Sequence, residues 1–400
     1  MFRMVSSFQH KSIDDIYLNI SHFLDHFIML IFAKAAYDAA KYFEISFDKF
    51  IVYGVFGFVL FGGMAPIAAY LADKFSRSLL MVVFHFGIGL SAIIAGLSIS
   101  PIQLAISIGF IGLFASIYHP VAIAMLIKSN KKIGFRLGIN GVYGNMGVAA
   151  APLITGIILT FGDWSLCFIL PGVFSLIYGI VFSISLKTIS FSSSSSEKVG
   201  AESFAPNWFR VLIALIITTS AGGFIFGSMT FFVPHYFEIS MTNISASVLV
   251  TGILASLVYA VASFSQIGVG WLVDRFSPKI ILFVIGIGQC FCIFLAANFT
   301  DLSLFFIMIF AMGFVFGQIP ITDTILSRYV PDNYRSKVLS VKFLLNLTIG
   351  ALVLPISSIM LQSGLPLSAL FSIMSAVAVL IVLSALILPH QDKAERLDLK

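Results

Sequence analysis

Three titratable residues lie close together in the first long apolar segment of the chain. His22, Asp25 and His26 are spaced at i, i+3 and i+4, so a helix places them on one face, with Asn19 one turn earlier. An ionisable side chain in an apolar span costs about 2.5–3.5 kcal/mol on insertion scales, so this face is expected to line a polar cavity. Aspartate and histidine in such a cavity can carry protons. The spacing therefore predicts a proton-coupling site, with a locked hydrogen-bond cluster between helices as the alternative.

Further polar residues in the apolar segments are candidates for a substrate cavity. Lys34 follows His26 by about 12 Å along a helix and could attract an anionic substrate, although Asp38 is at the spacing of a local ion pair. Asp323 and Lys342 have opposite charges and could neutralise one another. Basic candidates outnumber acidic ones, which favours an anionic or weakly acidic small-molecule substrate. The remaining candidates are Tyr118, His119, Asn140, Asn145, His235, Gln318 and Asn346.

The chain that carries these residues is too apolar for a water-soluble protein. Of its 400 residues 59% are hydrophobic and 10% are charged, and the mean hydropathy is +1.04. Runs of about 20 apolar residues, enough to cross about 30 Å of hydrocarbon, predict an all-α polytopic membrane protein with twelve transmembrane helices. These are expected at 17–40, 50–72, 79–99, 102–128, 135–160, 164–186, 209–237, 246–273, 279–297, 302–327, 336–361 and 365–388.

A polar stretch divides the spans into two groups of six. Residues 187–208 contain five consecutive serines and several charges, a linker composition. We therefore expect an N-terminal six-helix bundle at 1–186 and a C-terminal bundle at 209–400. Lysine and arginine concentrate in alternate connectors, which predicts that both termini and the linker are cytoplasmic. This pattern accounts for most of the net charge of +5, so no nucleic-acid partner is expected.

Other classes of function are disfavoured by the residues present. Cys167, Cys290 and Cys292 lie within apolar runs and indicate neither disulfides nor redox chemistry. The seven histidines form no His-x-x-His-His motif, which argues against an iron oxygenase, and the sequence has no Walker motif for a nucleotide-driven pump. We expect no metal, no cofactor and no enzymatic activity. A non-transporting receptor and a membrane enzyme are the alternatives of a different class.

The two halves contain an internal repeat. The connector after the second span contains Asp73 and the connector after the eighth contains Asp274, in the related sequences Ala-Tyr-Leu-Ala-Asp-Lys-Phe-Ser-Arg and Gly-Trp-Leu-Val-Asp-Arg-Phe-Ser-Pro-Lys. The same separation along the chain relates Gly112 to Gly313, Arg136 to Lys337 and Asn145 to Asn346. Repeated halves are typical of secondary transporters.

These connectors resemble the signature loop of the major facilitator superfamily, Gly-x-Leu-x-Asp-Arg-x-Gly-Arg-Arg. The matching residues are Leu71, Asp73, Lys74 and Arg77 in the first copy and Gly270, Leu272, Asp274 and Arg275 in the second, with Ala69, Ser76, Ser277 and Pro278 as departures. The resemblance implies two bundles that alternately open a midplane cavity, in a protein that functions as a monomer. It also implies that Asp73, Lys74, Arg77, Asp274 and Arg275 are gating residues that help to hold one conformational state.

Two further patterns resemble particular branches of that superfamily. Gly138, Gly147, Pro152 and Gly156 of the fifth span are similar to the antiporter motif of exporters, with ordinary close helix packing as the alternative. The runs from Ser21 to His26 and from Tyr118 to Pro120 resemble the fosmidomycin-resistance branch, with Val121 where that branch has glutamate.

The sequence thus predicts a proton-coupled secondary transporter for a small solute, in the bacterial cytoplasmic membrane, with export favoured by the antiporter-like motif. An organic-anion uptake symporter or a uniporter remains the alternative within the same class.

Overall fold

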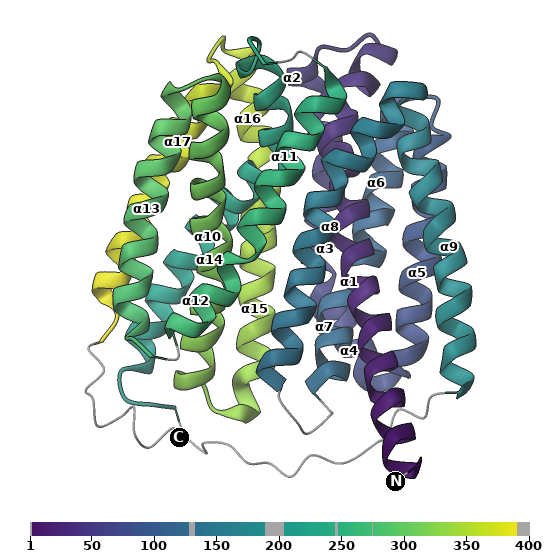
Figure 1. The fold of residues 1–400 in the computed structure, drawn as a ribbon, viewed down its shortest axis with the longest axis vertical. Helices are drawn as coiled ribbons and strands as arrows, with labels where there is room; N and C mark the ends of the chain where they lie inside the picture. Colours follow the sequence, from purple (N-terminus) through teal and green to yellow (C-terminus); the bar gives the residue numbers. More distant parts are fainter. Residues whose placement is uncertain (1, 128–132, 189–203, 245–246, 274, 390–400) are drawn as a thin grey trace.

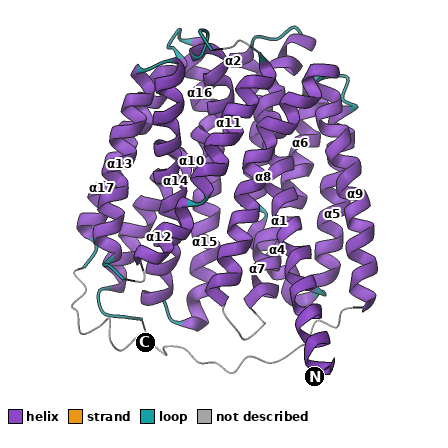
Figure 2. Ribbon diagram, viewed as in Figure 1, coloured by secondary structure: helices purple, strands orange, loops and turns teal. Residues whose placement is uncertain are grey.

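The computed structural model describes residues 2–127, 133–188, 204–244, 247–273 and 275–389. Within these residues the chain forms helices joined by short loops and contains no β-strand (Figure 2). Twelve helical spans in this part of the chain are long and apolar enough to cross a membrane, and their limits agree with the expected spans to within a few residues. The predicted fold class is therefore confirmed.

The N-terminal half contains the first six spans, two of which are interrupted. Its elements are α1 (Phe2–Tyr42), α2 (Phe47–Phe50), the 3-10 helix η1 (Ile51–Gly54), α3 (Val55–Gly63), α4 (Ala65–Lys74), α5 (Arg77–Gly96), α6 (Pro101–Ala115), α7 (Tyr118–Ile127), α8 (Ile133–Phe161) and α9 (Trp164–Thr188).

The C-terminal half contains the remaining six spans. Its elements are α10 (Trp208–Ser240), α11 (Val248–Ser263), α12 (Ser265–Val273), α13 (Pro278–Asn298), α14 (Asp301–Tyr329), α15 (Asp332–Ala351), α16 (Val353–Gln362) and α17 (Leu367–Ile387). Most of the expected linker at 187–208 lies outside the described residues.

Proline explains where several spans are interrupted. A proline ring clashes with the carbonyl of the residue four positions earlier. Pro120 lies four residues after Ser116, the C-cap of α6, and Pro355 lies four residues after Ala351, where α15 ends. Pro234 and Pro320 lie inside the continuous helices α10 and α14. Two of these four prolines therefore coincide with helix breaks.

The two halves stand side by side, with α8 and α11 adjacent near the centre of Figure 1. Their close approach depends on Gly252, because a Cβ atom there would lie 2.5 Å from the carbonyl oxygen of Pro152. The beginning of α1 and the end of α17 lie at the same end of the bundle, here called the terminal end; α2 lies at the opposite end, here called the α2 end (Figure 1).

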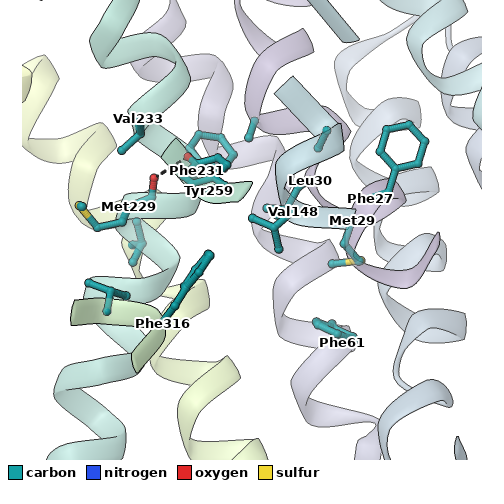
Figure 3. Close-up of a cluster of buried hydrophobic side chains, with 14 of the residues drawn as sticks. Phe27, Met29, Leu30, Phe61, Val148, Met229, Phe231, Val233, Tyr259 and Phe316 are labelled. Carbon is teal, nitrogen blue, oxygen red and sulfur yellow. Dashed lines mark hydrogen bonds between the residues drawn. The ribbon is translucent and has the colours of Figure 1, made fainter. Parts of the chain in front are cut away.

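An apolar region joins the halves between these two ends. Figure 3 shows buried side chains of α1, such as Phe27 and Leu30, in one continuous cluster with Phe231 and Val233 of α10. The rings of Phe32 and Phe231 are 6.1 Å apart across this boundary. Along α1 the apolar region therefore separates the His22–His26 group from Lys34.

Candidate functional site

The predicted polar face of α1 packs against α7 and α8. Glycines make this packing possible: a Cβ atom on Gly147 would lie 2.2 Å from the carbonyl oxygen of Phe23, and one on Gly144 would lie 2.6 Å from the His22 ring. His22 and Asp25 are buried, while His26 is partly exposed. The face is thus directed into the N-terminal half, as expected for polar residues in an apolar span.

His22 is fixed in orientation by its neighbours. Its Nδ1 lies 2.7 Å from the main-chain oxygen of Asn140; since a carbonyl only accepts, Nδ1 must donate, and the tautomer follows from this partner. The His22 ring stacks on Tyr118 with ring centroids 4.6 Å apart. The Nε2 atom of His22 therefore carries the lone pair and faces the rest of the cluster.

Three of the expected cavity residues form a hydrogen-bond network behind His22. The Asn140 amide donates to Asn19 Oδ1 at 2.9 Å and to the Tyr118 hydroxyl oxygen at 2.8 Å. The Tyr118 hydroxyl in turn lies 3.0 Å from the carbonyl oxygen of Leu18, to which it donates. Because these residues satisfy one another, their role is to hold α1, α7 and α8 in place around the histidines.

His26, His119 and Asp25 complete the cluster. His26 Nε2 lies 3.1 Å from His22 Nε2, and His119 Nε2 lies 3.6 Å from Asp25 Oδ2. The Asp25 side chain is fully buried, and neither of its carboxylate oxygens has a hydrogen-bond partner among the described residues. We call His22, Asp25, His26 and His119 the central cluster.

The central cluster also touches the other half of the protein. The ring of His119 stacks on Phe343 of α15, with centroids 5.3 Å apart and an interplanar angle of 29°. Phe61 of α3 lies on another side of the same imidazole, at 5.8 Å. A movement of α15 relative to α3 would therefore change the surroundings of His119.

A second polar group lies toward the α2 end, where Lys34 has a different partner from the one expected. Lys34 Nζ donates to the carboxylate of Glu238 of α10 and, at 3.0 Å, to Thr251 Oγ1 of α11. The predicted local pair with Asp38 is replaced by this contact because α10 presents a carboxylate to the buried side of α1. His235 Nδ1 lies 3.1 Å from the second oxygen of Glu238. We call Lys34, His235, Glu238 and Thr251 the outer group.

The remaining polar candidates do not gather in one site. Gln318 donates to the carbonyl oxygen of Thr218 at 3.2 Å and accepts from Gln289 at 2.7 Å, so it joins helices within the C-terminal half. Asn346 packs against Gly223 of α10, and the Asn145 side-chain amide nitrogen has no partner among the described residues. Asp323 and Lys342 form an ion pair, as the sequence suggested, although the Asp323 side chain is 50% exposed.

Part of the signature loop lies outside the described residues, namely the side chain of Asp73 and all of Asp274. Of the other residues, Arg77 donates to the carbonyl oxygen of Ala124 at 3.3 Å. Lys74 lies over the Tyr70 ring and Arg275 over the Trp271 ring. The contact of Arg77 links the third span to α7, the helix that carries His119.

The antiporter-like residues of α8 contact two helices. Gly147 contacts α1, as described above, while Pro152 and Gly156 face α11 of the other half; a Cβ atom on Gly156 would lie 3.2 Å from the carbonyl oxygen of Val248. A Cβ atom on Gly138 would meet nothing within 4 Å. The motif therefore provides a packing surface between the halves.

Two ion pairs were not found from the sequence. The first is the pair of Glu238 with Lys34. Glu238 was not singled out as a candidate because it lies at the end of a long apolar span, although its position three residues after His235 places both side chains on one face of a helix. The other is the pair between Arg136 and Asp15, in which Arg136 Nε donates to the carboxylate at 2.6 Å. Arg136 Nη1 also donates to the Leu126 carbonyl oxygen at 2.8 Å. This pair connects α8, α1 and α7 at the terminal end.

Twelve apolar helices in two packed halves, with a polar first helix, form the architecture of a membrane transport protein. The chain belongs to the Major Facilitator Superfamily, whose family model matches residues 18–341 and 237–399. It is accordingly an integral membrane protein and a transporter rather than an enzyme.

Solved structures share the fold at low sequence identity. The chain resembles an inward-facing bacterial homolog of the human lysosomal transporter Spinster (TM-score 0.73, 16% identity, covering 94% of this chain and 96% of that one). It also resembles a D-xylose-proton symporter (TM-score 0.72, 14% identity, covering 93% of this chain and 95% of that one). A peptide transporter POT is similar as well (TM-score 0.75, 14% identity, covering 93% of each chain). At these identities the likeness shows the fold alone.

A closer but shorter likeness is to the puromycin resistance protein pur8 of Streptomyces alboniger. The two chains are 33% identical over 110 residues, which is 27% of this chain and 22% of the relative. The similarity is therefore confined to about a fifth of that protein.

Proposed function

We propose that this protein is a proton-coupled secondary transporter that moves a small solute by alternating access. One observation carries the coupling: Asp25 is a fully buried carboxylate on α1 without a hydrogen-bond partner among the described residues. A buried charge without a partner is costly. A carboxylate in this setting is best tolerated with a proton bound, and it must lose that proton when the cavity opens to a different solution.

The histidines of the central cluster give the proton a route. His119 is the nearest of them to Asp25, and the rings of His22 and His26 lie 5.2 Å and 5.4 Å from the His119 ring. An imidazole ring can accept a proton on one nitrogen and release one from the other. The three rings can therefore pass a proton between Asp25 and the partly exposed edge of the cluster at His26.

In this proposal the outer group controls whether the α2 end of the protein is open or closed. Lys34 belongs to the N-terminal half, whereas Glu238 and Thr251 belong to the C-terminal half, and the Lys34 side chain is 2% exposed. The ion pair closes the α2 end while it is intact, so the α2 end opens only when the pair separates. By the distribution of lysine and arginine, the α2 end is the extracellular one.

Export is the direction that we propose. It is supported by the antiporter-like residues of α8 and by the partial similarity to a puromycin resistance protein. The anionic character of the substrate is less well supported than the sequence suggested, because Lys34 and Lys342 both have acidic partners. Organic anions and puromycin-like amphiphiles are therefore the two substrate classes to test.

The test is transport in proteoliposomes that contain the purified protein. Puromycin and a set of weak organic acids are screened for accumulation driven by an imposed pH gradient. We expect Asp25→Asn to abolish gradient-driven accumulation while preserving exchange of solute for solute. Asp163→Asn, the same change at an exposed helix N-cap where asparagine also caps well, serves as the control. Full gradient-driven transport by Asp25→Asn would disprove the coupling site.

A further inference from the structure

Three imidazoles and one carboxylate gather where α1 meets α7. Ring nitrogens of His22, His26 and His119 all lie within 4.8 Å of one another, and Asp25 lies beside His119. A proton relay uses the three rings one after another and does not require their nitrogens to face a common point. The gathering of three ring nitrogens within 4.8 Å of one another is also the arrangement of a metal site.

Two separations between the donor atoms are close to those of a tetrahedral metal site. Zinc binds nitrogen and oxygen at about 2.0–2.2 Å, which places the ligand atoms of a tetrahedron roughly 3.4 Å apart. The separation between the Nε2 atoms of His22 and His26 is 3.1 Å, and that between His119 Nε2 and Asp25 Oδ2 is 3.6 Å. The three imidazole nitrogens already lie within 4.8 Å of one another; to hold one ion they would draw closer by side-chain rotation, and the Asp25 carboxylate would turn from its place beside His119 to join them. Two histidines at i and i+4 on one helix face are also the spacing used by helical zinc motifs.

His22 already has the orientation of a metal ligand. Its Nδ1 donates to the main-chain oxygen of Asn140, so the lone pair on Nε2 faces His26 and His119. Metal-binding histidines are usually fixed by such a hydrogen bond on the other ring nitrogen. Gly144 preserves the space for this ring, since any larger residue would overlap it.

Asp25 supplies the charge that a cation requires. Its carboxylate oxygens have no hydrogen-bond partner among the described residues, and a divalent ion would provide both a positive charge and a bond to oxygen. His26 and His119 are partly exposed, so the cluster is not sealed on every side. The sequence predicted no metal because its seven histidines form no His-x-x-His-His motif. His119 is far from His22 and His26 along the chain, and the break before α7 brings it beside them.

We propose that His22, Asp25, His26 and His119 form a binding site for one divalent transition-metal ion of the zinc class. Three imidazoles and one carboxylate suit Zn²⁺, Co²⁺ or Ni²⁺, whereas Mg²⁺ and Ca²⁺ prefer sites made of oxygen ligands. The inference goes beyond the proposed transport activity, which needs no metal.

The test measures Zn²⁺ binding to the purified full-length protein in detergent by isothermal titration calorimetry, without any transport step. The reference protein carries His10→Ala and His390→Ala, so that the histidines near the two chain ends do not contribute. We expect one Zn²⁺ per chain, with binding unchanged by excess Mg²⁺. His26→Gln and His119→Gln should each weaken binding by about tenfold or more. His235→Gln, outside the cluster, is the matched control and should bind like the reference protein.

Size-exclusion chromatography and thermal unfolding establish that each variant is folded. The zinc X-ray absorption spectrum of the reference protein identifies the ligand atoms without any further variant. Imidazole ligands are expected. Thiolate ligands from Cys290 or Cys292 would overturn the proposed site. The absence of saturable Zn²⁺ binding would also overturn the proposed site, as would an unchanged affinity for Zn²⁺ in the folded variants His26→Gln and His119→Gln. None of these results affects the proton-coupling proposal, which stands or falls on gradient-driven transport by Asp25→Asn.

Discussion

Lys34 of α1, which is buried, and Glu238 of α10, whose side chain is 14% exposed, form an ion pair that joins the two halves of the protein. Both charges are further bonded, Lys34 to Thr251 and Glu238 to His235. The ring of His235 lies against Phe47 of α2, with centroids 4.3 Å apart. The pair is thus enclosed by elements of both halves, and its separation would expose two charges at once.

Removing one member of this pair should destabilise the closed α2 end. Breaking a fully buried ion pair leaves an uncompensated charge, at a cost of about 3–5 kcal/mol, whereas replacing both members is often close to neutral; because Glu238 is only partly buried, the cost here should lie below that range. We expect Lys34→Gln and Glu238→Gln each to lower the thermal unfolding temperature in detergent and to slow transport. The double variant should recover most of the lost stability.

Lys41→Gln is the control for the pair, because Lys41 is an exposed residue of the same helix that lies over the Tyr37 ring. It should leave the unfolding temperature unchanged. Equal stability of the two single variants and the unsubstituted protein would show that the pair does not hold the halves together.

Gly144 should be essential to the central cluster for steric reasons. A methyl group at this position would lie 2.6 Å from the His22 ring, so Gly144→Ala must displace the ring or push α8 away from α1. Overpacking of this kind costs about 1–3 kcal/mol. We expect lower thermal stability together with loss of pH-gradient-driven transport.

Gly138→Ala is the matched substitution on the same helix. A Cβ atom there meets nothing within 4 Å, and alanine is the better helix former by about 1 kcal/mol. It should preserve transport and leave stability equal or slightly higher. If both glycine variants behaved alike, the His22 ring would not depend on the space that Gly144 leaves.

The sequence was sufficient to predict the helices and the polar face of α1. Long apolar runs must be helical in a bilayer, because every backbone group has to be hydrogen-bonded within its own segment. His22, Asp25 and His26 could be placed on one face because the period of an α-helix is fixed. Proline alone was an incomplete guide to the breaks: Pro120 and Pro355 coincide with them, whereas Pro234 and Pro320 lie inside continuous helices.

Contacts between distant segments could not be predicted in the same way. That His119 joins His22 and His26 depends on how the broken fourth span packs against α1, and no local pattern encodes this. Lys34 has an acidic residue, Asp38, one turn away in its own helix, so the sequence suggested that local partner and did not point to Glu238, which belongs to the other half. Charge alone does not select a partner; the packing of α1 against α10 does.

The ion pairs Asp15–Arg136 and Asp323–Lys342 differ in solvent exposure and should therefore differ in their contribution to stability. The side chains of Asp15 and Arg136 are 24% and 16% exposed, and Arg136 also binds the carbonyl oxygen of Leu126. The Asp323 side chain is 50% exposed. Exposed ion pairs contribute about 0–1 kcal/mol and are weakened by salt.

We therefore expect Asp15→Asn to lower the free energy of unfolding by about 1 kcal/mol, with a smaller effect at high ionic strength. Asp323→Asn should have no measurable effect. Thermal unfolding of both variants at low and high salt measures the difference. A larger loss for Asp323→Asn than for Asp15→Asn would contradict the ranking by burial.

The orientation of the protein can be tested with two serines at opposite ends of the bundle. Ser46 precedes α2 and Ser76 precedes α5, and both are exposed. The distribution of lysine and arginine predicts that Ser76, at the terminal end, faces the cytoplasm and that Ser46, at the α2 end, faces the exterior. In a background of Cys167→Ala, Cys290→Ala and Cys292→Ala, Ser46→Cys in intact cells should react with a membrane-impermeant maleimide. Ser76→Cys should react only after the cells are broken. The reverse pattern of labelling would invert the proposed topology and place the Lys34–Glu238 pair at the cytoplasmic end.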